Sequence, residues 1–171
     1  EIKMKINNNF GGYSINKNCY NYLVENFSKG STMLELGSGY GTKKLSEHFN
    51  MYSIENYEKF CGLFESYYIH APIKYYDDVY TKPNLPNQKG WYDSYYFEGE
   101  LPKDYDVILV DGPNGNYGRG GFLKHLDLFK SDVPIIFDDI HREPERLLME
   151  EVAKVLNKKI SIIDRVTGII K

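Results

Sequence analysis

The sequence predicts an α/β fold with a mostly parallel, seven-stranded sheet that contains one reversed strand. Three observations lead to this prediction. Strand-like and helix-like segments alternate along most of the chain, as they do in proteins with parallel sheets. A glycine-rich turn joins the first strand-like run to the helix after it. Two strand-like runs close the chain with too few residues between them for a helix, so they must pair antiparallel.

The individual elements follow from two kinds of hydrophobic pattern. Short apolar runs predict strands at residues 32–36, 51–55, within 67–76, 105–110, 133–137, 160–163 and 167–170. Apolar residues at helical spacing predict helices at residues 14–27, 41–49, 57–66, 122–130 and 143–156. Ser14 suits an N-cap, and Pro144 is tolerated in the first turn of a helix.

Residues 77–103 interrupt the alternation, because this segment is rich in proline, glycine and aromatic residues. Connections of this length are usually functional or disordered. The density of aromatic residues argues against disorder. We therefore expect a lid or substrate-facing insertion within a single domain of residues 1–171, and we expect Trp91 to contact the substrate.

The turn at residues 34–41 reads Leu-Glu-Leu-Gly-Ser-Gly-Tyr-Gly. Glycines permit a tight turn and let a ligand approach the backbone. The pattern E-x-G-x-G-x-G resembles the first motif of methyltransferases that use S-adenosylmethionine (SAM). The resemblance implies a Rossmann-like, doubly wound sheet with SAM bound at Glu35, Gly37, Ser38, Gly39 and Gly41. Glu35 would support the loop backbone or approach the amino group of the methionine part.

An acidic residue, Glu55, ends the second strand-like run, 18 residues after Gly37. An acid at about this distance and position accepts hydrogen bonds from the ribose of a nucleotide cofactor. A carboxylate suits this task because it only accepts hydrogen bonds and can bridge two hydroxyls. The alternative is a solvated acid at the end of a strand.

Three further acids follow the fourth and fifth strand-like runs, namely Asp111, Asp138 and Asp139. Ligands of open α/β sheets bind at the carboxyl ends of the strands. Three carboxylates there, without an obvious cationic partner, would raise one another's pKa, and a bound divalent cation such as Mg²⁺ or Mn²⁺ would relieve the repulsion. The alternative is that these residues cap a loop and a helix, with Asp139 pointing outward.

These positions resemble the metal ligands of cation-dependent O-methyltransferases, including catechol and macrolide-sugar enzymes. Asp111 would also lie beside the cofactor. The tracts from Asp111 to Gly121 and from Ile136 to Glu145 resemble the plant glucuronoxylan 4-O-methyltransferase family more closely, although that family commonly has His where this chain has Asp138. This resemblance implies a saccharide hydroxyl as acceptor.

Two arginines, Arg119 and Arg142, suit a carboxylate or phosphate on the acceptor, because guanidinium binds such groups bidentately. The alternative is a structural ion pair, for example Arg142 with Asp111 or Glu145. His141 is the candidate general base, since an imidazole accepts a proton near neutral pH. Asp111 is the alternative base if no metal binds.

Composition narrows the class of protein. The chain has 171 residues, 42% of them hydrophobic, a net charge of −3 and a pI of about 5.8. It lacks the basic surface expected of a nucleic-acid partner. No apolar run approaches the ~18 residues of a membrane span. Cys19 and Cys61 suggest neither a disulfide framework nor a zinc site. We expect a cytoplasmic protein, and a homo-oligomer is compatible with the sequence.

The function expected from these patterns is SAM-dependent methyl transfer to a hydroxyl of a saccharide or glycan, assisted by a divalent cation. One alternative is a methyltransferase that acts on a phenol or on a protein side chain. Another is a module that binds SAM without turnover, because a fold does not determine a function.

Overall fold

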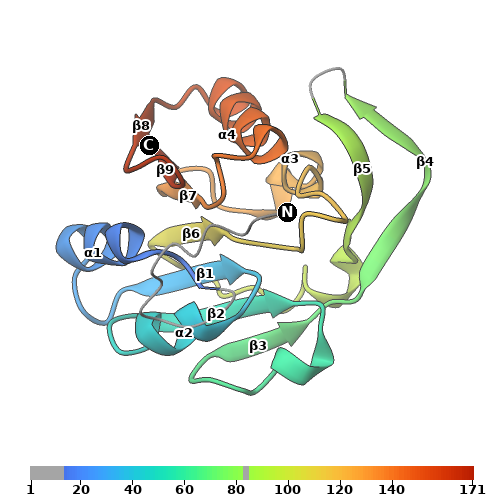
Figure 1. Ribbon diagram of the computed structural model, residues 1–171. Helices are drawn as coiled ribbons and strands as arrows, with labels where there is room; N and C mark the ends of the chain where they lie inside the picture. The colour runs from blue at the N-terminus through green and yellow to red at the C-terminus, as the bar shows by residue number, and fades with distance from the viewer. Residues whose placement is uncertain (1–13, 83–84) are drawn as a thin grey trace, which may run out of the picture.

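The computed structural model describes residues 14–82 and 85–171, and it contains a seven-stranded sheet and a separate two-stranded sheet (Figure 1). The α-helices are α1 Lys17–Asn26, α2 Tyr40–Leu45, α3 Gly121–Lys124 and α4 Glu143–Leu156. The strands are β1 Thr32–Leu36, β2 Asn50–Glu55, β3 Tyr67–His70, β4 Ile73–Lys82, β5 Leu85–Tyr92, β6 Val107–Val110, β7 Ile135–Phe137, β8 Ile160–Ile162 and β9 Gly168–Ile170. Short 3-10 helices cover Glu58–Phe60, Ser94–Tyr96 and Leu126–Leu128.

The large sheet has the strand order β3-β2-β1-β6-β7-β9-β8. The first five strands in this order are parallel, and β9 is antiparallel to both β7 and β8. This arrangement confirms the expected α/β class and the mostly parallel sheet. It differs from the classic doubly wound order, because β9 lies between β7 and β8. The order reverses between β1 and β6, so a switch point lies there.

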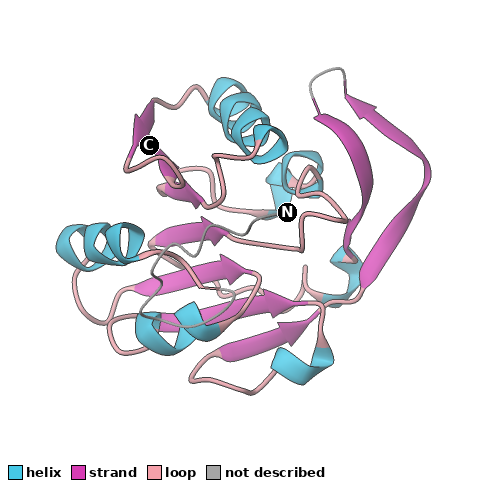
Figure 2. Cartoon of the chain, in the orientation of Figure 1, coloured by secondary structure: helices cyan, strands magenta, loops and turns pink. Residues whose placement is uncertain are grey.

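Figure 2 shows the helices, strands and loops of the chain in the orientation of Figure 1. Apolar side chains from successive strand residues face opposite sides of the sheet, and each side has its own core. On one side, residues of α1 and α2 pack on residues such as Met33 and Val107. On the other side, residues of α3, α4 and the β4–β5 hairpin pack on residues such as Leu34 and Ile108. Burial on both faces explains why β1 and β6 read as nearly continuous apolar runs.

Local sequence determines where the helices begin and end. The N-cap of α1 is Asn16 rather than Ser14, because the Asn16 side chain accepts the backbone N–H of Cys19 at 2.9 Å. In α4, Pro144 lies in the first turn together with two acids, and Asn157 ends the helix in the left-handed conformation with φ 52°. Among the described residues, no helix is long and apolar enough to cross a membrane.

Two helix predictions were wrong or only partly right. Residues 57–66 form a short 3-10 helix and turns instead of a helix, and Gly62 there has φ 79°. Residues 122–130 contain the end of the four-residue helix α3 and a 3-10 turn. Both segments carry apolar residues at helical spacing, but those of 122–130 fill the core from short turns, whereas Tyr57 and Leu63 in the other segment are exposed. Periodicity alone does not distinguish these cases.

The segment expected to be an insertion contains the second half of a hairpin. Strands β4 and β5 pair antiparallel, with Ile73 opposite Tyr92 and Lys74 opposite Trp91. The hairpin stands beside the edge to which the arrowheads of β1, β2 and β6 point (Figure 1). Three aromatic residues of the segment, Trp91, Tyr92 and Phe97, are buried in the core. The rings of these three residues serve packing, whereas Tyr95 and Tyr96 of the same segment are exposed.

Candidate functional site

The backbones after β1 and β6 touch at the switch point. A methyl group built on Gly37 would lie 2.9 Å from the carbonyl oxygen of Asp111 and 2.9 Å from the Cα of Gly112. Gly37 also has φ 91°, which disfavours any side chain. Gly41 packs against the backbone nitrogen of Ile15, where a methyl group would lie at 3.2 Å. Internal packing therefore accounts for two of the three glycines in the predicted cofactor loop.

Glu55 lies at the tip of β2, as expected, but both oxygens of its carboxylate accept hydrogen bonds from backbone N–H groups. One oxygen accepts the N–H of Ser38 at 2.7 Å, and the other accepts the N–H of Tyr57 at 2.7 Å. The backbone of Asn56 also bonds to it, and burial raises its pKa above the ordinary value. Glu55 thus holds the turn after β1 directly.

Glu35 is buried between α2 and the neighbouring strand β2. Its Oε1 accepts hydrogen bonds from the hydroxyls of Thr42 and Ser53, each at 2.6 Å. Thr42 in turn accepts the N–H of Gly39 at 3.2 Å and lies 3.0 Å from the hydroxyl of Ser38. Burial raises the pKa of Glu35 to about 7. This network supports the loop backbone, which is one of the two roles expected for Glu35.

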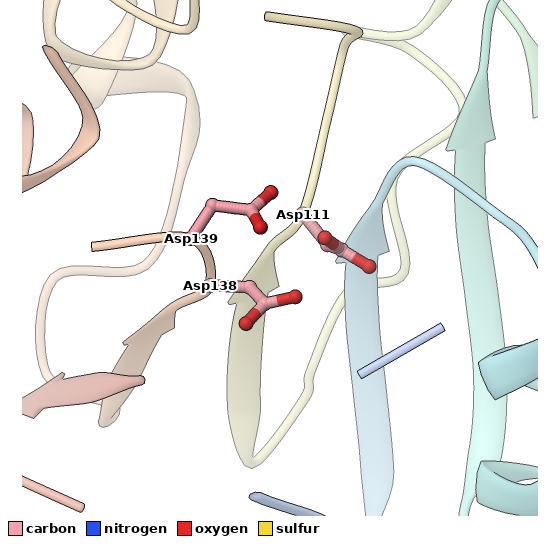
Figure 3. A group of neighbouring side chains, drawn as sticks. All are labelled: Asp111, Asp138 and Asp139. Atoms are coloured by element: carbon pink, nitrogen blue, oxygen red, sulfur yellow. The ribbon is translucent and has the colours of Figure 1, made fainter. Parts of the chain in front are cut away.

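The three predicted acids converge at the tips of β6 and β7 (Figure 3). One oxygen from each of Asp111, Asp138 and Asp139 lies within 4.8 Å of the other two. Asp138 is buried, and its carboxylate accepts a hydrogen bond from the hydroxyl of Thr167 at 3.4 Å. Asp111 and Asp139 are partly exposed. Asp139 adopts φ 61°, a left-handed conformation that is uncommon for a residue other than glycine.

The acids have cationic partners, which agrees with the structural ion pair that we considered as the alternative role of the arginines. Arg119 and Arg142 both donate to Oδ2 of Asp139, at 3.0 Å and 2.5 Å. Arg142 also lies 3.5 Å from the buried carboxylate of Glu145. The side-chain contacts of Arg142 match the structural ion pair that we considered as the alternative, with Asp139 in place of Asp111.

Arg119 lies beneath the site and is only 6% exposed. Its guanidinium donates to the carbonyl oxygens of Pro113 at 3.0 Å, Asp111 at 3.1 Å and Asp138 at 3.4 Å. It therefore joins the loops after β6 and β7. These bonds occupy the donors that were expected to bind a substrate, so the position of Arg119 favours a structural role.

The charges in this cluster do not balance. The carboxylates of Asp111, Asp138, Asp139 and Glu145 face two guanidinium groups, which leaves two excess negative charges when all are ionised. Burial and the charge of Asp139 raise the pKa of Asp138 to about 6. Burial and the charge of Asp138 raise the pKa of Asp111 well above its usual range, and the two carboxyls are hydrogen-bonded. Bound protons or a cation would neutralise the excess.

The structure buries Trp91, which we expected to contact the substrate, and leaves the side chain of the candidate base His141 exposed. Trp91 is 1% exposed and stacks on His125 with ring centroids 5.2 Å apart. Its ring also contacts Phe97 and Phe129, so Trp91 packs within an aromatic cluster of the core and its role is packing. His141 follows the acidic pair, but its side chain is exposed and no hydrogen bond or ion pair joins it to the described residues of the cluster.

A tyrosine that the sequence interpretation missed also reaches the switch point. Tyr92 is 1% exposed, and its hydroxyl has no hydrogen-bond partner among the described residues. A methyl group built on Gly112 would lie 2.4 Å from that hydroxyl oxygen. No sequence signal separates Tyr92 from the chain's other tyrosines.

Neither a search of protein-family models nor a search of curated proteins finds a match to this chain.

Proposed function

We propose that this protein is a SAM-dependent O-methyltransferase that acts on a hydroxyl of a saccharide, assisted by a divalent cation. The observation that carries the proposal is the convergence, at one sheet edge, of the turn after β1, Glu55, and the three acids after β6 and β7. This edge flanks the switch point, where open α/β sheets bind their ligands. One reversed strand in a seven-stranded parallel sheet also agrees with the resemblance to SAM methyltransferases.

The cofactor would lie over the turn after β1, with Glu55 facing its ribose. A carboxylate offers about four acceptor positions. Three backbone N–H groups, those of Ser38, Asn56 and Tyr57, use three of them. The remaining capacity fits one ribose hydroxyl rather than the two that the sequence suggested. A second hydroxyl would have to displace the N–H of Ser38, so we expect SAM binding to shift this turn.

The acids fit a divalent cation in composition and spacing. Hard cations prefer oxygen ligands at about 2.0–2.6 Å, and oxygens within 4.8 Å of one another can share one such ion. Both arginines bind Oδ2 of Asp139 and leave Oδ1 for a cation. The two excess negative charges equal the charge of one divalent ion. When bound, the ion would lower the pKa of the acceptor hydroxyl and fix its position.

The acidic cluster can also remove the proton of the acceptor hydroxyl when no cation is bound. Asp111 and Asp138 share a hydrogen bond and have raised pKa values, so one of them holds a proton under conditions where an ordinary aspartate does not. Such a pair can accept the proton of the acceptor hydroxyl. The ionised member of the pair, rather than the exposed His141, is therefore our candidate base if no cation binds.

The saccharide acceptor rests on the sequence resemblance alone, because Arg142 already pairs with Asp139 and Glu145. Phenols and protein side chains remain alternative acceptors, and a SAM-binding module without turnover remains the alternative outside enzymes.

Calorimetry would test the proposal directly. S-Adenosylhomocysteine, the product of methyl transfer, is titrated into the protein, and Mg²⁺ or Mn²⁺ is then titrated into the complex. We expect one cofactor site and one cation site per chain, with the cation site lost in Asp138→Asn and kept in the control Asp132→Asn. Asp132 is exposed, so its substitution leaves the cluster intact.

Turnover decides between the acceptors. Transfer of a labelled methyl group from SAM is measured with uronic-acid glycosides, neutral glycosides and catechol. Methylated glycosides support the proposal, whereas catechol methylation alone would support the phenol alternative. Cofactor binding without any transfer would support the binding module. No heat with S-adenosylhomocysteine would contradict every SAM-based interpretation.

A further inference from the structure

The hydroxyl group of Tyr92 lies where the loops after β1 and β6 meet. Tyr92 is the last residue of β5. Figure 1 shows the hairpin of β4 and β5 beside the edge to which β1, β2 and β6 point. Its hydroxyl oxygen occupies the space that a side chain on Gly112 would need, and Gly37 touches the same backbone. Because both neighbours are glycines, neither contributes a side chain between this hydroxyl and the crevice that open α/β sheets have at the switch point.

The aromatic ring of Tyr92 has an evident structural purpose, but its hydroxyl does not. The ring packs edge-on against Trp91, with centroids 5.3 Å apart, and a phenylalanine would fill the same space. The hydroxyl is buried without a hydrogen-bond partner among the described residues. Nearly all buried polar groups in native proteins have a partner, so an exception needs an explanation.

The charged groups around the Tyr92 hydroxyl indicate which kind of hydrogen-bond partner it can take. Burial, followed by the charges of Glu55 and Asp111, raises the pKa of the Tyr92 phenol well above its ordinary value. The hydroxyl therefore stays protonated near neutral pH and is available as a donor. The group that it lacks is an acceptor oxygen brought from outside the protein.

We propose that Tyr92 is a ligand-binding residue whose hydroxyl donates a hydrogen bond to an oxygen of the nucleoside cofactor in this crevice. The inference rests on the proposed function, because it takes the crevice to be the SAM site. The cofactor reaches the hydroxyl when the turn after β1 moves aside, a movement that Gly37 and Gly39 permit.

Substitution Tyr92→Phe separates a binding role from a packing role. The variant keeps the ring and removes only the hydroxyl, so the unfolding midpoint of the ligand-free protein should stay unchanged or rise. Calorimetry with S-adenosylhomocysteine should show about tenfold weaker binding, because one hydrogen bond to the ligand is lost.

Tyr105→Phe is the matched control. Tyr105 is also buried, but its hydroxyl accepts the backbone N–H of Lys130 at 2.7 Å. This variant should lower the unfolding midpoint and leave the affinity for S-adenosylhomocysteine unchanged.

Two results with Tyr92→Phe would overturn the inference while the proposed function stands. One is an affinity within about twofold of the wild-type value, which is less than the loss of a net hydrogen bond. The other is a loss of stability as large as that of Tyr105→Phe, which would give the hydroxyl a structural partner. If the wild-type protein itself does not bind S-adenosylhomocysteine, the proposed function and this inference fail together.

Discussion

Glu55 accepts the backbone N–H of Ser38 through Oε2 at 2.7 Å, and this bond ties the tip of β2 to the glycine-rich turn after β1. Its other oxygen accepts the N–H of Tyr57 at 2.7 Å. The residue that the sequence marks as a ribose ligand is thus also the residue that fixes the conformation of the turn. Because the carboxylate of Glu55 holds the turn and is also the expected ribose ligand, the free energy of unfolding and the affinity for the cofactor must be measured separately for each variant.

Glu55→Gln should destabilise the protein by about 1–3 kcal/mol, because an amide NH₂ would face a backbone N–H that now has an acceptor. Urea unfolding at neutral pH measures the change. The control is Glu25→Gln on the exposed side of α1, which should shift the free energy of unfolding by less than about 0.5 kcal/mol. Equal effects from both variants would mean that the Glu55 bonds do not hold the turn.

The raised pKa of Glu35 predicts that the free energy of unfolding depends on pH. Its pKa is about 7 in the folded protein, against an ordinary value of 4.5, so the native state binds the proton more tightly than the unfolded state. The free energy of unfolding should therefore fall as pH rises through this interval and stay level above it. The contribution of Glu35 is about 3 kcal/mol.

Glu35→Gln removes this contribution and keeps an oxygen that accepts the hydroxyls of Thr42 and Ser53. From pH 5 to pH 8 the variant should therefore lose less of its free energy of unfolding than the wild type does. Urea unfolding of both proteins at the two pH values measures the difference. Asp111, Asp138 and Glu55 also have raised pKa values and still contribute in the variant. The exposed Glu98→Gln should leave the pH profile of the wild type unchanged, and an equally unchanged profile for Glu35→Gln would rule out its proposed titration.

The order of elements along the main sheet could be predicted from sequence because the central strands are buried on both faces. Strands β6 and β7 are uninterrupted apolar runs, β1 and β2 are mostly apolar with the buried polar residues Glu35 and Ser53 inside them, and a turn residue or an acid stands at the end of each strand. The same property predicted the meeting of Asp111, Asp138 and Asp139, since the carboxyl ends of adjacent parallel strands share one edge of the sheet.

The remaining features depend on contacts between residues that are distant in sequence. Nothing near Arg119 in the sequence shows that its guanidinium bonds to three carbonyl oxygens of two different loops. Likewise, Trp91 lies in a segment rich in turn residues, and only the pairing of β4 with β5 places it in the core. The sequence therefore predicted the location of the site more reliably than the role of each side chain.

Arg119→Lys should cost about 3 kcal/mol of stability, because a lysine keeps the charge but cannot form the several directed bonds of the buried guanidinium. Arg142→Lys is the comparison, since Arg142 binds the same Oδ2 of Asp139 from a position that is 38% exposed. Its cost should stay within about 1 kcal/mol. Urea unfolding of both variants gives the ranking, and the reverse order would show that Arg142, not Arg119, joins the loops after β6 and β7.

Gly121→Ala tests whether the glycine that begins α3 serves packing on the hairpin. A methyl group on Gly121 would lie 2.1 Å from Cγ of Trp91, which is fixed in the core. Overpacking of this kind costs about 1–3 kcal/mol, and we expect the fluorescence of Trp91, the chain's one tryptophan, to change as well. Gly99→Ala is the control, because a methyl group there meets nothing within 4 Å. A Gly121→Ala variant as stable as Gly99→Ala, with unchanged fluorescence, would mean that the close contact between α3 and β5 is not needed for folding, and that this glycine is free to serve a ligand instead.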